Sequence, residues 1–77
     1  MEAVIVYSKK NCMHCQFTKK FLTEKQIEFQ EKDVEQDEQA LNEVKALGFT
    51  SLPIIVGPGI APFQGFRPDK LERLRSN

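Results

Sequence analysis

Five consecutive apolar residues, Ala3 to Tyr7, place the strongest restriction on how this chain folds. Val4, Ile5 and Val6 are β-branched, which favours a strand. Successive side chains of a strand point to opposite faces of its sheet. Because both sets are apolar here, both faces of the strand must be covered, as in sheets that carry helices on either side. The sequence therefore predicts an α/β fold.

The segment after this strand predicts a helix and then a second strand. Ser8 to Asn11 is polar and ends the first strand, and Asn11 is a residue type favoured as a helix cap. A helix of about three turns follows, because apolar residues recur at helical spacing. The stripe expected to face inward consists of Phe17, Thr18, Phe21 and Leu22. Residues 27–34 predict a strand with Ile27 and Phe29 on one face.

Asp37 and Gly48 mark the two ends of a second predicted helix. Aspartate is favoured just before the first turn, and glycine is favoured just after the last one. The stripe expected to face inward consists of Ala40, Leu41, Val44 and Leu47.

The remaining residues predict two short strands and a short helix. Residues 54–56 are apolar, and a Gly-Pro-Gly turn at 57–59 leads into a strand at 60–63. Pro62 places that strand at the edge of the sheet, because proline has no N–H to donate. Pro68 suits the first turn of the last helix, with Leu71 and Leu74 facing inward.

The predicted order is β-α-β-α-β-β-α. A helix joins the first two strands, which are therefore expected to be parallel with a right-handed crossover. The last two strands form an antiparallel hairpin. One four-stranded mixed sheet flanked by three helices follows.

Length and charge exclude several classes of function. The 77 residues are expected to form one domain, 1–77. Lys+Arg and Asp+Glu both number 11, so no excess positive charge attracts nucleic acid. No apolar run approaches the roughly 20 residues of a membrane span, and the first residues indicate a strand rather than a signal peptide. We expect a cytoplasmic protein with neither a nucleic-acid nor a membrane partner.

Two cysteines, Cys12 and Cys15, lie where the first strand gives way to the first helix. At a helix N-terminus, free backbone N–H groups and the helix dipole favour an anion, and the thiolate is the reactive form of a cysteine. Lys9 and Lys10 add positive charge nearby. Cys15 is one turn further along the same side of the helix. This spacing suits a nucleophile, Cys12, and a resolving cysteine, Cys15, for thiol–disulfide exchange.

Other roles for the cysteine pair fit less well. A zinc site needs about four ligands, and this chain has two Cys and one His. Attachment of haem needs Cys-x-x-Cys-His, but position 16 is Gln16. A disulfide that closes so short a loop stabilises a fold little. We therefore expect no bound metal.

Three further positions near the cysteines are expected to meet a partner. Met13 and His14 lie between the cysteines and are expected to be exposed. Pro53, preceded by Ser51 and Leu52, is either a simple strand-start proline or a cis proline. In the second case it presents the backbone of Leu52 beside the cysteines, for a partner peptide to pair with.

Together these residues resemble the glutaredoxin family of the thioredoxin fold. The matching features are Tyr7-Ser8-Lys9, Cys12-x-x-Cys15, Leu52-Pro53-Ile54 and Gly65-Phe66. In that family the proline before the third strand is cis, so the resemblance implies a cis Pro53.

Within that family the chain resembles the NrdH-redoxins. The segment Gly65-Phe66-Arg67-Pro68-Asp69 is similar to their signature, as are Ala46 to Phe49. Ordinary glutaredoxins carry an acidic, glycine-rich stretch there that holds glutathione. The family often has Trp where this chain has Phe63, which leaves two roles open for Phe63, contact with a partner or core packing. Arg67 and Asp69 either pair locally and hold the loop or form a solvated surface pair.

The resemblance implies an electron donor to the large subunit of class Ib ribonucleotide reductase. The resemblance also implies re-reduction by thioredoxin reductase, with NADPH as the source of electrons and no bound cofactor. We expect the protein to be a monomer. The expected partner-binding residues are Lys9, Met13, His14, Ser51, Leu52, Pro53, Gly65, Phe66 and Arg67. Two alternatives stay open, a glutathione-dependent glutaredoxin and a non-catalytic redox-sensing or binding module.

Overall fold

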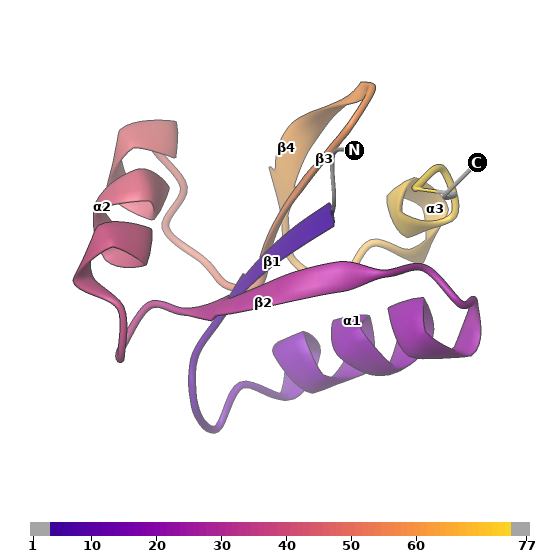
Figure 1. The fold of residues 1–77 in the computed structure, drawn as a ribbon, viewed down its shortest axis with the longest axis horizontal. Coiled ribbons are helices and arrows are strands. Elements are labelled where there is room, and N and C mark those ends of the chain that lie inside the picture. The colour runs from indigo at the N-terminus through magenta and orange to yellow at the C-terminus, as the bar shows by residue number, and fades with distance from the viewer. Residues whose placement is uncertain (1–3, 75–77) are drawn as a thin grey trace.

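The computed structural model describes residues 4–74 and has the predicted order of elements (Figure 1). They are β1 (Val4–Ser8), α1 (Met13–Glu24), β2 (Phe29–Asp33), α2 (Glu38–Leu47), β3 (Ile54–Gly57), β4 (Ile60–Gln64) and α3 (Pro68–Leu71). Ala3, the first residue of the predicted first strand, lies outside the described residues. Strand β2 is shorter than predicted, because the chain from Gln26 to Glu28 is a connection that reaches β1 only at Phe29.

The four strands form one mixed sheet in the order β2-β1-β3-β4. Strand β1 is parallel to β2 and antiparallel to β3, and β3 is antiparallel to β4. The central position of β1 explains why it is apolar on both faces. Pro62 lies in β4, at the predicted edge of the sheet, where a missing N–H costs no bond within the sheet.

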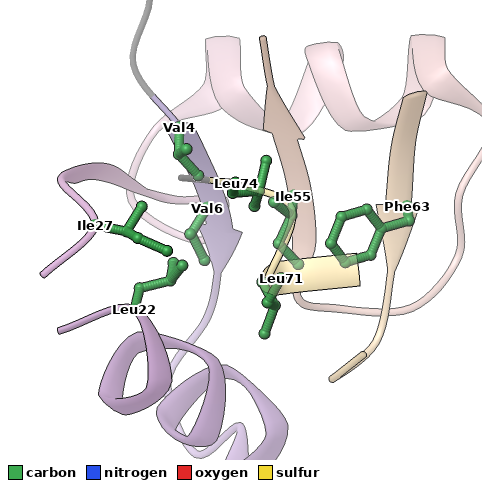
Figure 2. Close-up of a cluster of buried hydrophobic side chains, with 8 residues drawn as sticks. All are labelled: Val4, Val6, Leu22, Ile27, Ile55, Phe63, Leu71 and Leu74. Carbon is green, nitrogen blue, oxygen red and sulfur yellow. The ribbon is translucent and has the colours of Figure 1, made fainter. Parts of the chain in front are cut away.

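One face of the sheet carries α1 and α3, and the other carries α2 (Figure 1). The core under α1 and α3 is the larger one and is drawn in Figure 2. It consists of Val4, Val6, Leu22, Ile27, Ile55, Phe63, Leu71 and Leu74. Leu71 and Leu74 therefore face inward as predicted. Phe63 is only 4% exposed, so core packing is its role in this fold.

A second core lies under α2 and contains Tyr7, Ala40, Val44 and Ile54. At its margin the phenol of Tyr7 donates a hydrogen bond of 2.7 Å to Glu43, which also pairs with Lys32 at 3.2 Å. Burial and, second, the contact with Glu43 raise the pKa of Tyr7 to about 12. These three residues tie β1, β2 and α2 together.

The ends of α2 follow the prediction, and one position of its inward stripe does not. The Asp37 carboxylate accepts hydrogen bonds from the backbone N–H groups of Gln39 and Ala40, and Gly48 adopts φ 81°. Leu47, predicted to face inward, is 39% exposed. It is the last residue of the helix and is followed by Gly48, whose left-handed backbone ends the helix.

The buried stripe of α1 also differs from the prediction. It consists of Cys15, Thr18 and Leu22, whereas Phe17 is 45% exposed and Phe21 is only partly buried. The helix is rotated so that Cys15 faces the core, which turns Phe17 to the flank. The prediction was wrong for Phe17 because it assumed that an aromatic side chain, rather than a cysteine, would take the buried face of the helix.

Candidate active site

Cys12 caps the first turn of α1. Its backbone is extended, with φ −107° and ψ 106°, and its Sγ accepts a hydrogen bond from the backbone N–H of Cys15 at 3.2 Å. Asn11, the predicted cap, has φ 59°. That prediction was wrong, because a left-handed residue turns the chain into the helix one position early. Cys12 then takes the position where a side chain meets the free N–H groups.

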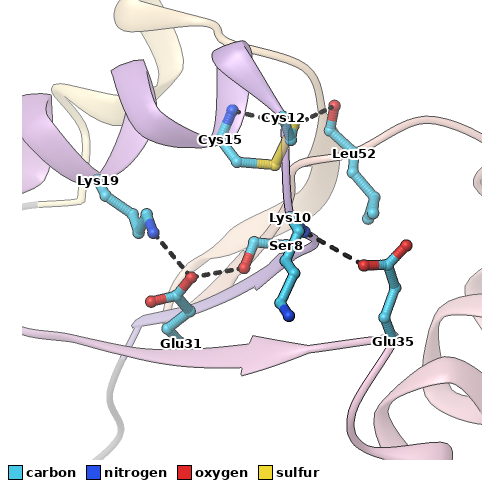
Figure 3. Close-up of a disulfide and its surroundings, with 8 residues drawn as sticks. All are labelled: Ser8, Lys10, Cys12, Cys15, Lys19, Glu31, Glu35 and Leu52. Carbon is cyan, nitrogen blue, oxygen red and sulfur yellow. Dashed lines mark hydrogen bonds and ion pairs between the residues drawn. A yellow bond between two sulfur atoms is a disulfide. The ribbon is translucent and has the colours of Figure 1, made fainter.

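Cys12 and Cys15 form a disulfide, with their Cα atoms 5.2 Å apart (Figure 3). Cys15 is fully buried, whereas Cys12 is partly exposed. A partner approaching from solvent therefore reaches the sulfur of Cys12 and not that of Cys15.

The backbone of Leu52 lies beside the cysteine pair. Its carbonyl oxygen is 3.9 Å from Cys12 Sγ (Figure 3). The peptide bond between Leu52 and Pro53 is cis, as the family resemblance implied, and Pro53 is buried. The structure thus brings together two segments that are 40 residues apart in the sequence.

Gln64 and Gly65 hold the segment that carries Leu52. The Gln64 side-chain oxygen accepts hydrogen bonds from the backbone N–H groups of Thr50 at 3.3 Å and Ser51 at 3.2 Å. The backbone N–H of Gly65 donates to the carbonyl of Pro53 at 2.8 Å, and Gly65 has φ 85°. The sequence prediction missed Gln64, because a solvent-side glutamine in a strand carries no sign of a long-range contact.

Charged groups surround the loop before Cys12, and they carry both signs. Lys9 and Lys10 are exposed as expected. The backbone N–H of Lys10 donates a hydrogen bond to Glu35 at 3.3 Å, so a carboxylate lies beside this pair of lysines. Glu31 accepts a hydrogen bond from the buried Ser8 hydroxyl at 2.6 Å and pairs with Lys19 at 2.9 Å (Figure 3). The bond from Ser8 and then the bond from Lys19 hold the pKa of Glu31 below its ordinary value.

An exposed aromatic surface extends along α1 away from the cysteines. Met13 is 69% exposed, and the ring centroid of Phe17 is 6.3 Å from that of His14 and 5.9 Å from that of Phe66. Phe21 meets Phe66 edge-on at 6.2 Å. The aromatic rings line a shallow groove of about 340 Å³ formed by Phe17, Lys20, Phe21, Glu24 and Phe66. The structure thus joins Phe66 to the helix that carries Met13 and His14.

Arg67 directly follows Phe66 and is engaged locally. Its guanidinium contacts both carboxylate oxygens of Asp69, at 3.4 Å and 3.3 Å, and both side chains are more than half exposed. Arg67 and Asp69 therefore pair, as both possibilities left open by the sequence require, and the pair is largely exposed to solvent.

Neither a metal centre nor a membrane span is found within residues 4–74. In this range no three His, Cys, Asp or Glu side chains gather where they could hold a metal ion. None of the helices described is long and apolar enough to cross a membrane.

Comparison with known proteins gives one consistent result. The family model described as Glutaredoxin matches residues 4–59. The chain is 41% identical over 71 residues to the glutaredoxin-like protein NrdH of Lactococcus lactis, covering 92% of this chain and 97% of that protein. It is 30% identical over 71 residues to the NrdH protein of Escherichia coli K12, covering 92% and 86%.

Solved structures agree with this result. The NrdH-redoxin of Escherichia coli, whose structure is described as the basis of a thioredoxin-like activity profile, superposes with a TM-score of 0.90. It shares 27% identity and covers 97% of each chain. From the motif, the buried and exposed cysteines and these matches, we conclude that this chain belongs to the glutaredoxin family and, within it, to the glutaredoxin-like NrdH thiol–disulfide oxidoreductases.

Proposed function

We propose that this protein carries electrons from thioredoxin reductase to the large subunit of a class Ib ribonucleotide reductase. It works as a cytoplasmic monomer of one domain, with NADPH as the electron source and no cofactor of its own. The observation that carries the proposal is the pairing of a partly exposed Cys12 with a fully buried Cys15 beside the backbone of Leu52. The resemblance to the NrdH-redoxins supports the choice of partners.

The reaction begins with the Cys12 thiolate of the reduced protein. The N–H of Cys15 and the N-terminus of α1 stabilise a negative charge on Cys12 Sγ. The thiolate attacks one sulfur of the partner disulfide, and the other partner sulfur leaves as a thiolate. A mixed disulfide between Cys12 and the partner results.

Cys15 completes the transfer. Its sulfur attacks Cys12 Sγ, which forms the Cys12–Cys15 bond and breaks the bond from Cys12 to the partner. The proton of the Cys15 thiol and one proton from solvent end on the two partner sulfurs, and two electrons have moved to the partner. Thioredoxin reductase reverses these steps on the oxidised protein.

Residues around the cysteines are proposed to bind the partner. Leu52 offers a backbone edge beside Cys12, where an extended partner segment pairs in β fashion. Ser51, Pro53 and Gly65 hold that edge in place. The proposed contacts on the α1 side are Lys9, Met13, His14 and Phe66, with Arg67 at the margin.

Glutathione is proposed to be a poor reductant for this protein. It presents two carboxylates, which need cations and N–H donors, and an amino group, which needs an acid. Arg67 is already paired with Asp69, and Pro68 has no N–H to donate. The Nζ atom of Lys70 lies over the ring of Phe63, 5.5 Å from its centroid. Few groups remain free there to hold glutathione.

A coupled assay tests the choice of reductant. NADPH oxidation is followed with thioredoxin reductase, and separately with millimolar glutathione and glutathione reductase. We expect rapid turnover in the first case and slow turnover in the second. Equal rates would replace this assignment with a glutathione-dependent glutaredoxin.

A second assay tests the electron acceptor. Purified class Ib ribonucleotide reductase is supplied with NADPH, thioredoxin reductase and this protein, and deoxyribonucleotide formation is measured. We expect product to form with the wild-type protein and not with Cys12→Ser. Absence of product, while the reductase still turns over, would leave a redox-sensing module as the better description.

A further inference from the structure

Thr18 carries a buried hydroxyl that has no hydrogen-bond partner among residues 4–74. Its side chain is fully inaccessible to solvent. A threonine in a helix commonly bonds to a carbonyl one turn earlier, but its Oγ1 makes no such bond here. A buried polar group left unpaired destabilises a fold. An unpaired hydroxyl in a core therefore calls for a physical explanation.

The position of Thr18 explains why its hydroxyl is unpaired. Thr18 follows Cys15 by three residues on the buried stripe of α1. Side chains at this spacing are neighbours, with Cβ atoms about 5–6 Å apart, and a helical side chain leans toward the preceding turn. Thr18 and Cys15 thus share the buried face of α1 one turn apart, and no hydrogen bond joins the Thr18 hydroxyl to the Cys15 sulfur in the disulfide state.

The other buried hydroxyl of this region is already engaged. Ser8 is 1% exposed, and its hydroxyl donates its one proton to Glu31 at 2.6 Å. Thr18 is therefore the buried hydroxyl that still has a proton to donate.

We propose that Thr18 is a positioning residue whose hydroxyl donates a hydrogen bond to the Cys15 sulfur once the disulfide is reduced. Cys15 is fully buried, so its sulfur has no water to solvate it. The inference rests on the proposed role of Cys15 as the resolving cysteine and is independent of the identity of the protein partners.

The bond matters most when Cys15 resolves the mixed disulfide. As its proton departs toward the partner sulfur, negative charge develops on Cys15 Sγ until the Cys12–Cys15 bond forms. Hydrogen bonds to charged acceptors are stronger than those to neutral ones. The Thr18 hydroxyl therefore stabilises the attacking sulfur and orients it.

The same hydrogen bond changes the free energy of one redox state relative to the other. In the disulfide state the hydroxyl is unpaired, and in the dithiol state it is paired. Thr18 thus favours the reduced protein. Thr18→Val replaces the hydroxyl with a methyl group of similar size, which removes the unpaired group from the oxidised state and the donor from the reduced state.

The experiment measures the thiol–disulfide equilibrium against dithiothreitol, with no protein partner present. For Thr18→Val we expect the constant for reduction of the disulfide to fall about tenfold, or about 30 mV toward more negative potential for a two-electron couple. Thr18→Ser keeps the hydroxyl and is expected to retain the wild-type constant. Thr18→Ala lacks it and is expected to match Thr18→Val.

Thermal unfolding of both redox states separates this role from simple packing. We expect Thr18→Val to lower the Tm of the reduced protein but not that of the oxidised protein. Equal changes in both states, with an unchanged equilibrium constant, would overturn the proposal. If Thr18→Val does not fold, the comparison of Thr18→Ser with Thr18→Ala decides, and equal constants for these two would also overturn it. Because no partner is used, failure here leaves the proposed electron acceptor untouched.

Discussion

The backbone N–H of Cys15 donates a hydrogen bond to the sulfur of Cys12 at a distance of 3.2 Å. This bond makes Cys12 the cap of α1, because its sulfur accepts one of the free N–H groups of the first turn. The same donor is in place when the disulfide opens and Cys12 becomes a thiolate. One contact therefore serves the folding of the helix and the chemistry of the proposed nucleophile.

The two cysteines of the reduced protein should differ in reactivity. Cys12 is partly exposed at the helix N-terminus and Cys15 is buried, so we expect iodoacetamide at neutral pH to modify Cys12 first. Peptide mass spectrometry after short exposure measures the two rates. Equal labelling, or faster labelling of Cys15, would contradict the assigned roles.

Removal of each cysteine should have a different result. Cys12→Ser is expected to abolish disulfide reduction, because the reachable sulfur is gone. Cys15→Ser should still attack but not resolve, so a mixed disulfide with the partner accumulates and is visible on a non-reducing gel. No trapped species with Cys15→Ser, while Cys12→Ser traps one, would reverse the two roles.

Gln64 should affect binding of the reductase more than stability. Its side-chain oxygen holds two backbone N–H groups of the segment before Leu52, and a hydrogen bond of this kind contributes about 1 kcal/mol. We expect Gln64→Leu to raise the KM for thioredoxin reductase about fivefold with a small change in Tm. Gln64→Glu keeps an acceptor oxygen and serves as the matched control. If both variants behave like the wild type, Gln64 does not position this segment.

Pro68 offers a test of glutathione discrimination. Pro68→Asp supplies a backbone N–H and an acidic group next to Arg67, so turnover with glutathione should rise several-fold. Pro68→Ala supplies the N–H alone and is expected to produce a smaller rise. The glutathione reductase assay compares them. A Pro68→Asp rate no higher than the wild-type rate would show that this stretch does not set the preference.

The phenol of Tyr7 should lose its proton only at high pH, and this shift in its pKa should make the stability of the fold depend on pH. It is the one tyrosine in the chain, and the chain has no tryptophan, so absorbance at about 295 nm reports the phenolate of Tyr7. Since burial and Glu43 raise its pKa to about 12, the native protein should show a midpoint near that value and the unfolded protein one near 10. The contribution of the protonated Tyr7 phenol to the free energy of unfolding is present below pH 10 and is lost as pH rises toward 12. A native midpoint near 10 would contradict the contact with Glu43.

Local sequence signals predicted much of this fold because local forces decide those features. The apolar run at β1 favours a strand buried on both faces, Asp37 and Gly48 match the ends of α2, and Pro62 excludes an interior strand. The short spacing of Cys12 and Cys15 places both at one helix terminus. Each of these results depends on residues within a few positions of one another.

Tertiary packing decided what these signals left open. The rotation of α1 buries Cys15 and Thr18 and exposes Phe17, because the sheet accommodates one face of the helix. Phe63 lies in the core because its position in β4 directs its side chain toward α3. Gln64 reaches back to Ser51, a contact across 13 positions. The sequence alone determined the chemistry of the cysteines and the order of the elements, and only the packing of distant segments determined which sulfur is reachable and what surrounds it.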